Sequence, residues 1–135
     1  MPYWLLKTEP STYSFADLVK EKKTAWTGVT NAAALIHLRA MKKGDTAFIY
    51  HTGDERAIVG MAEIIKPAYP DPNAESEKHV AVDIKPLKLL KSPVTLEKIK
   101  SDAAFKGWDL LRIGRLSVVP TSQEIWDRVI ELSQS

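Results

Sequence analysis

The chain has 135 residues, of which 44% are hydrophobic and 27% charged, and it contains no cysteine. This length suffices for one domain with a single core, and the missing cysteines exclude disulfides, thiolate metal sites and cysteine nucleophiles. The net charge of +2 is too small for a protein that coats duplex DNA by charge alone, although a local basic patch is compatible with a nucleic-acid partner.

The first predicted element is a strand over residues 3–7, where aromatic and aliphatic residues follow one another. Ser14 and Asp17 then have the spacing of a capping box, which predicts a helix from there to about Lys23. A second helix is predicted over residues 31–41, with Asn31 as its N-cap.

The middle of the chain has the pattern of a hairpin followed by a third strand. Residues 46–52 and 57–65 form a hairpin around a polar turn, and a proline-rich loop follows over residues 66–78. A third strand covers residues 79–84 and can continue over 87–90, beyond a proline.

The last third of the chain is predicted to form shorter helices and strands. A short helix covers residues 95–100, and the ambiguous residues 101–115 fit another short helix around residues 103–106 and then a loop. A strand over residues 116–120 precedes a capping box at Thr121 to Glu124, which starts a final helix. Strands at both ends with helices between them indicate the α+β class, with a curved mixed sheet or a small barrel.

Motifs for catalysis, metals and membranes are missing from the sequence. It has no G-x-S-x-G elbow and no phosphate-binding glycine loop. His37, His51 and His79 lack the spacing of metal ligands, so we expect no metal and no cofactor. No apolar run approaches the ~18 residues of a membrane span, and the N-terminus lacks a signal-peptide pattern. We therefore expect no membrane partner and a cytoplasmic protein, or a nuclear one in a eukaryote.

Trp26 stands apart from the other tryptophans. Trp4 and Trp126 fit a strand and a helix pattern and are expected in the core, whereas Trp108 fits either role. Trp26 falls in a threonine- and glycine-containing connector between two predicted helices, where Gly28 allows a close approach. It is either a core ring or a wall on which a base stacks.

Several short motifs occur in the order in which one known family has them. The chain resembles the EVE domain family in the segments Tyr3–Pro10, Trp26–Asn31, Arg39–Asp45, Phe48–Thr52, Ile58–Glu63, Tyr69–Pro72 and Arg115–Pro120. The resemblance implies one EVE domain over residues 1–135, with a PUA-like curved mixed β-barrel flanked by helices. It further implies a non-enzymatic module that binds DNA or RNA and holds a modified base, such as a methylated one, in a partly aromatic pocket.

The same resemblance assigns ligand-binding roles by position. The site residues that it implies are Lys7, Thr8, Glu9, Trp26, Gly28, Val29, Asn31, Arg39, Tyr50, His51, Thr52 and Arg115. Lys7 to Glu9 would line the mouth of the pocket, Tyr50 to Thr52 its opposite side, and Arg39 and Arg115 would be polar or phosphate contacts. The chain departs from the family at Thr30, where relatives often carry arginine.

Two other functions remain open on the sequence. One is a nucleoside- or small-molecule-processing enzyme that uses Glu9 and His51 as acid and base, which requires both groups to reach one substrate. The other is a protein-interaction module built on the same fold. His51 itself fits equally a hydrogen-bonded histidine at a strand end and a polar group at the mouth of a pocket.

Overall fold

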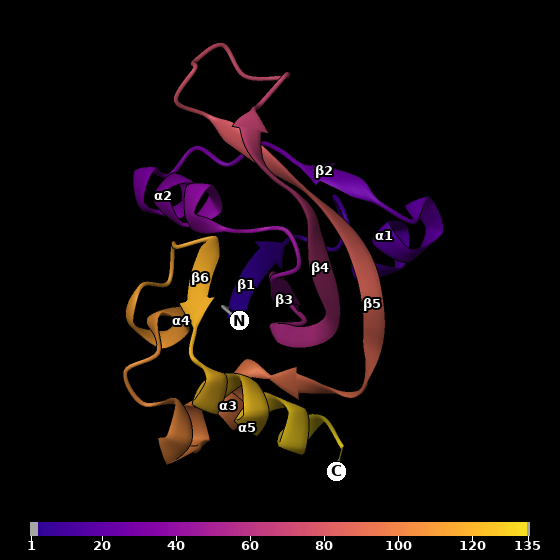
Figure 1. The fold of residues 1–135 in the computed structure, drawn as a ribbon. Coiled ribbons are helices and arrows are strands. Elements are labelled where there is room, and N and C mark those ends of the chain that lie inside the picture. Colours follow the sequence, from indigo (N-terminus) through magenta and orange to yellow (C-terminus); the bar gives the residue numbers. More distant parts are fainter. Residues whose placement is uncertain (1–2, 135) are drawn as a thin grey trace.

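The computed structural model describes residues 3–134, which form one six-stranded sheet with helices around it (Figure 1). The elements in chain order are β1 (Tyr3–Thr8), α1 (Phe15–Glu21), β2 (Thr24–Trp26), α2 (Ala32–Ala40), β3 (Thr46–His51), β4 (Ala57–Pro70), β5 (Val80–Thr95), α3 (Leu96–Ser101), the 3-10 turn η1 (Ala103–Phe105), α4 (Asp109–Arg112), β6 (Val118–Thr121) and α5 (Gln123–Ser133).

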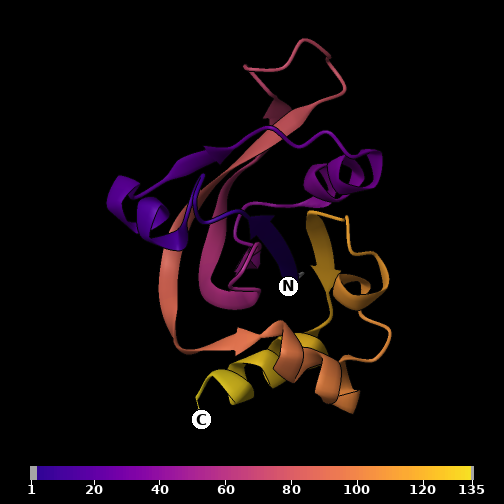
Figure 2. The ribbon, with the colours of Figure 1, turned by 180° about the vertical axis from the view of Figure 1, so that it is seen from behind.

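The strand order is β2-β5-β4-β3-β1-β6, and β1 with β3 is the parallel pair among antiparallel neighbours. The α+β class and the mixed sheet are therefore as expected. The sheet is open rather than closed, because its edge strands β2 and β6 pair only with β5 and β1. The long strands β4 and β5 bend through the height of the molecule, with α1 and β2 on one side and α2 on the other (Figure 2).

The β4–β5 hairpin is longer than predicted, because residues 66–70 continue β4 where a loop was expected. Pro70 pairs with Val80, and the register shifts between Ile64 and Lys66 and again between Lys66 and Tyr69. Bulges of this kind accommodate prolines and bend a strand. Pro86 likewise lies inside β5, opposite Ala62, at another shift in register.

Helix caps follow the sequence closely, with one correction. Ser14 accepts from Asp17 N, and the Asp17 side chain accepts from Ser14 N, as the predicted capping box requires. Asn31 caps α2 by accepting from Ala34 N. The predicted box at Thr121 is wrong, because Thr121 ends β6 and Ser122 caps α5 by accepting from Ile125 N.

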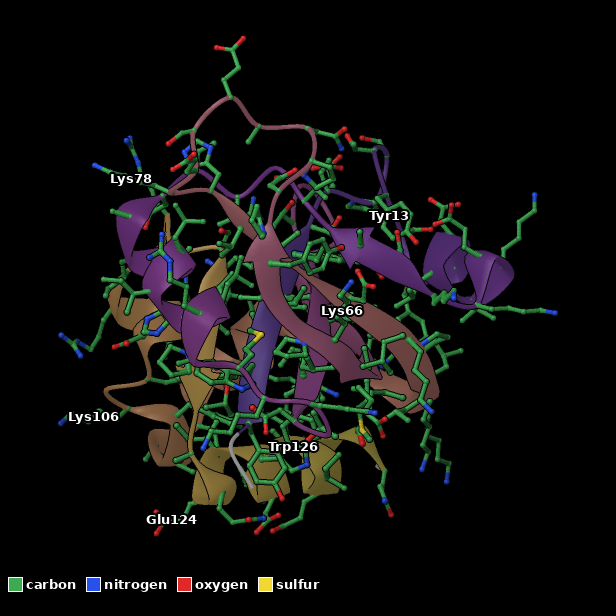
Figure 3. The ribbon with its side chains drawn as sticks, turned by 45° about the horizontal axis from the view of Figure 1, so that its top comes forward. Tyr13, Lys66, Lys78, Lys106, Glu124 and Trp126 are labelled. Carbon is green, nitrogen blue, oxygen red and sulfur yellow. The ribbon has the colours of Figure 1, made fainter. Side chains whose placement is uncertain are left out.

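The tryptophans that were expected in the core are buried. Trp126 projects from α5 (Figure 3). Its ring stacks on Phe48 of β3, with ring centroids 3.7 Å apart, and its centroid lies 4.5 Å from that of the Tyr3 ring. Trp4 donates from its indole nitrogen to Asp45 Oδ2 over 3.0 Å, and the same oxygen accepts from Lys42 N. Asp45 is 1% exposed, so one buried carboxylate links β1 to the turn between α2 and β3.

A second buried carboxylate, Asp71, links the end of the β4–β5 hairpin to the segment after β2. Its Oδ2 accepts from Gly28 N over 3.0 Å, and its Oδ1 accepts from Asn73 N over 2.8 Å. Gly28 has φ +79°, a conformation in which a side chain is strained. Asp71 therefore holds the backbone two residues after Trp26.

The substitution Asp45→Ala is expected to lower the free energy of unfolding by about 3 kcal/mol, because it leaves the Trp4 indole N–H and Lys42 N–H without their charged acceptor. Urea denaturation measures the loss. The exposed Asp54 provides the control Asp54→Ala, which we expect to change stability by less than about 0.5 kcal/mol. Equal stability of the two variants would contradict the proposed link.

The substitution Asp71→Ala is expected to lower the free energy of unfolding by about 2 kcal/mol and to speed hydrogen exchange at the Gly28 amide, because that amide loses its acceptor. Exchange measured residue by residue by NMR separates this local effect from global destabilisation. Asp54→Ala again serves as the control. Unchanged protection of Gly28 in Asp71→Ala would show that the carboxylate does not hold this segment.

Candidate functional site

A cavity of about 630 Å³ lies between the end of β1, the strand β2 with the segment after it, and the residues that precede β6. We call it the Trp26 pocket. It is lined by Lys7, Thr8, Glu9, Thr12, Tyr13, Thr24, Ala25, Trp26, Thr27, Gly28, Val29, Thr30, Asn31, Arg115 and Ser117. Its volume lies within the range of small-molecule sites. One wall comes from β2 and the segment after it, and the other from the residues before β6.

Trp26 forms an aromatic wall of this pocket. It is the last residue of β2 and pairs with Val82 of β5, so its predicted place in a connector is wrong. The strand holds the ring in a half-buried position, and Tyr13 meets it edge to face, with centroids 6.1 Å apart and an angle of 81° between the planes. Strand pairing thus positions the backbone of Trp26, and the edge-to-face contact with Tyr13 supports its ring.

The Tyr13 hydroxyl donates to the Glu21 carboxylate. Burial first, and then this hydrogen bond, raise the pKa of Tyr13 to about 12. The phenol beside Trp26 is therefore neutral at physiological pH, and the aromatic side of the pocket carries no charge.

The end of β1 supplies the polar side of the pocket. Lys7 donates from Nζ to Gly114 O over 3.0 Å, and burial lowers the pKa of this lysine. The Thr8 hydroxyl donates to Tyr13 O over 2.6 Å. The Glu9 carboxylate is exposed and accepts from both the amide and the hydroxyl of Ser11.

The Trp26 pocket brings together most of the predicted site residues. These are Lys7, Thr8, Glu9, Trp26, Gly28, Val29, Asn31 and Arg115. Asn31 and Arg115 are exposed, whereas Val29 is buried. Thr30, which stands where relatives often have arginine, is exposed and also lines the pocket.

The remaining predicted residues lie elsewhere. Tyr50 and Thr52 line a second cavity of about 230 Å³, next to the Trp26 pocket, instead of its opposite wall. His51 and Arg39 line neither cavity. Arg39 donates instead to Lys78 O, which joins α2 to the hairpin loop (Figure 3). The alternation of side chains along β3 explains the division, because His51 points to the other face from Tyr50 and Thr52.

His51 is a hydrogen-bonded histidine rather than a pocket group. It is 8% exposed, its Nε2 accepts from Phe15 N over 3.0 Å, and its Nδ1 lies 2.6 Å from Glu55 Oε1. Since Nε2 accepts, Nδ1 carries the proton and donates to Glu55. Both ring nitrogens are occupied, so the proposed acid–base pair of Glu9 and His51 has no free histidine nitrogen to offer a substrate.

Residues 3–134 contain no group of three or more histidine, aspartate or glutamate side chains that could hold a metal ion. No helix in the same part of the chain is long and apolar enough to cross a membrane.

Comparison with known proteins gives consistent matches over nearly the whole chain. The model of the EVE domain matches residues 2–132. Thymocyte nuclear protein 1 of Rattus norvegicus is 32% identical over 98% of this chain and 74% of its own length. An NMR structure from Rhodopseudomonas palustris has a TM-score of 0.93 and 45% identity, and covers 99% of this chain and 94% of the other.

A crystal structure shows the human THYN1 protein in complex with DNA that contains 5-methylcytosine. It has a TM-score of 0.92 and 31% identity to this chain, and the match covers 100% of this chain and 99% of the human one. The family model and these relatives agree over the segments that form both the sheet and the Trp26 pocket. This chain belongs to the EVE domain family.

Proposed function

We propose that the chain is a non-enzymatic nucleic-acid-binding module that holds a modified base in the Trp26 pocket. The observation that carries this proposal is a half-buried tryptophan ring on the wall of an open cavity of about 630 Å³, with Lys7 and Arg115 among the other lining residues. An aromatic wall beside cations suits a flipped base and its phosphates. Stacking on such a ring contributes ~1–3 kcal/mol per base.

The polar groups of the pocket support the reading of a base edge. Asn31 Oδ1 is used as the cap of α2, while its Nδ2 has no acceptor among residues 3–134. The amide group can therefore donate two hydrogen bonds to a ring nitrogen or carbonyl of a base. Thr30 is uncharged where relatives often carry arginine, so the positive charge of this pocket comes from Lys7 and Arg115.

The complex of the human relative with 5-methylcytosine DNA supports a methylated cytosine as one ligand. The open, curved sheet supports a PUA-like arrangement in which the gap between the edge strands β2 and β6 receives the base. We also propose that residues 1–135 act as one domain. The core of a protein-interaction surface is depleted of charged residues, whereas the lining of the Trp26 pocket includes Lys7, Glu9 and Arg115 beside its hydroxyl, amide and aromatic side chains.

The substitution Trp26→Ala is expected to weaken binding of a 5-methylcytosine DNA oligonucleotide by about 5- to 100-fold, because the stacking surface is removed. Fluorescence anisotropy measures the affinity, and circular dichroism checks the fold. Trp26→Phe keeps an aromatic face and is expected to lose less. The proposal is wrong if Trp26→Ala binds modified and plain strands as the parent protein does.

The parent protein is expected to bind the 5-methylcytosine strand about fourfold more tightly than the unmodified strand, because burying one methyl group contributes about 0.8 kcal/mol. Paired titrations at one salt concentration measure the ratio, and matching strands of methylated RNA test the other nucleic acid. Equal affinities for every pair of modified and plain strands would contradict the proposed recognition of a modified base, although not nucleic-acid binding itself.

The substitution Asn31→Ser separates capping from base reading. Serine caps a helix about as well as asparagine, so the unfolding free energy should change by less than about 0.5 kcal/mol. Binding should weaken by about 5- to 100-fold, because the Nδ2 donor is lost. Unchanged affinity for the modified strand in isothermal titration would remove Asn31 from the site.

A further inference from the structure

A second cavity of about 230 Å³ lies next to the Trp26 pocket, and Lys7 lines both. We call it the Lys7–Arg56 cavity. It is lined by Lys7, Tyr50, Thr52, Gly53, Arg56, Leu96, Leu110 and Gly114. The charged residues of this lining are the two cations Lys7 and Arg56, and it has no carboxylate. Protein surfaces usually carry both signs of charge side by side. The cavity therefore has the charge of an anion site.

Neither cation has a counter-ion among residues 3–134. Lys7 Nζ donates to Gly114 O, and Arg56 Nε donates to Gly53 O over 3.1 Å. Both acceptors are neutral carbonyl groups, and the Arg56 guanidinium keeps its terminal N–H groups unused. Burial lowers the pKa of Lys7, so its charge is held at a cost that no described carboxylate offsets. A bound anion would offset it.

The backbone of Arg56 is held in an unusual conformation. Its φ of +43° lies in the left-handed region, which costs a residue with a side chain about 1–2 kcal/mol. The Arg56 carbonyl accepts from Leu96 N over 2.8 Å, which ties this turn to the start of α3. Strain of this kind occurs at sites where the position of a side chain matters.

Tyr50 offers a third donor. The residue is 4% exposed and lines the cavity, and its hydroxyl has no hydrogen-bond partner among residues 3–134. No buried side-chain nitrogen or oxygen of these residues is unpaired, so the hydroxyl is accessible from the cavity. Burial raises the pKa of Tyr50, and the nearby charge of Arg56 opposes that rise. The hydroxyl is therefore protonated at neutral pH and lies within the electrostatic influence of the guanidinium.

The surroundings limit the site to one small anion. Glu9 lies beside Gly53 but does not line the cavity, and its carboxylate accepts from Ser11 and from the Thr52 hydroxyl. The next cavity along the surface shares Arg56 and Leu96, and its lining has three carboxylates (Asp54, Glu55 and Glu97) against the two cations Arg56 and Lys100. These carboxylates would repel further phosphate groups. The favourable path for a nucleic-acid backbone therefore ends at Arg56.

We propose that the Lys7–Arg56 cavity binds the phosphodiester group adjacent to the base in the Trp26 pocket, with Lys7, Arg56 and Tyr50 as donors. The inference rests on the proposed function, because the shared Lys7 side chain places an anion here next to an occupant of the Trp26 pocket. Arginine and lysine are the usual partners of phosphate oxygens. The proposal assigns Arg56 to the binding machinery, a residue that the family motifs do not include.

The first experiment uses inorganic phosphate as the probe and needs no base. Titration followed by ¹H–¹⁵N NMR is expected to shift the Gly53 and Gly114 amides and the Arg56 Nε–H, and Arg56→Gln should abolish the amide shifts. Arg112→Gln is the matched control, because Arg112 is an exposed arginine paired with Asp109. Phosphate shifts that are absent from this cavity, or that persist in Arg56→Gln, would overturn the proposal.

The second experiment measures binding of the 5-methylcytosine oligonucleotide at several salt concentrations. Loss of one phosphate contact in Arg56→Gln is expected to weaken binding at least fivefold and to reduce the slope of log Kd against log salt by about 0.7–0.9. Arg112→Gln should leave both unchanged. If Trp26→Ala weakens binding but Arg56→Gln changes neither affinity nor slope, the phosphate site is wrong and the base pocket stands.

The opposite result is also distinguishable. If the parent protein binds the oligonucleotide no better than Trp26→Ala, the proposed function fails, and the phosphate titration alone decides whether the Lys7–Arg56 cavity is an anion site. Urea denaturation of Arg56→Gln checks that its fold is intact. Arg56→Lys, which keeps the charge, should restore most of the salt slope but not the full affinity.

Discussion

β1 and β3 run parallel in the sheet, with Lys7 opposite Tyr50 and Thr8 opposite His51. The carboxyl ends of both strands therefore reach the same edge, although the two strand ends lie 43 positions apart along the chain. Ligand sites of sheets that contain parallel strands often lie at such an edge. Here the β1 end lines both cavities, and Tyr50 and Thr52 reach only the smaller one. The parallel pairing thus makes the two cavities neighbours.

The open sheet has a direct consequence for the larger cavity. The edge strand β2 has only three residues, and β6 has only four. The pocket lining includes β2 with the segment after it and, on the β6 side, Arg115 and Ser117, so the Trp26 pocket opens between β2 and the segment before β6. Asp71 of the long hairpin then fixes Gly28, next to the aromatic wall. The curvature of the sheet, the short edge strands β2 and β6, and the buried Asp71 carboxylate together define the shape of this opening and keep it accessible.

Polar groups divide into two sets across the molecule. Asp45, Asp71 and His51 are buried and have their hydrogen bonds satisfied inside the fold. In contrast, Asn31 Nδ2 and the Tyr50 hydroxyl have no acceptor among residues 3–134. Asn31 is exposed, and no buried side-chain nitrogen or oxygen of the described residues is unpaired, so both donors are accessible to a ligand. Their positions at two adjoining cavities indicate where a ligand with several acceptors fits.

The sequence by itself determined the elements whose signals are local. Capping residues at Ser14 and Asn31, hydrophobic patterns and ordered family motifs predicted the main helices, most strands and the α+β class. Local signals were wrong where pairing partners are distant in sequence. Trp26 proved to end a strand because Val82 pairs with it, and residues 66–70 extended β4 because bulges accommodate their prolines.

The tertiary structure alone decided which side chains share a site. The family motif predicted Tyr50, His51 and Thr52 on one side of a single pocket. Side chains alternate along β3, so His51 points to the other face, where its ring nitrogens bond to Phe15 N and Glu55. Asp71 and Arg56 gained roles through contacts with Gly28 and through the cavity shared with Lys7. Sequence patterns report the faces of single elements, whereas the direction of a side chain toward a cavity depends on how distant strands pair.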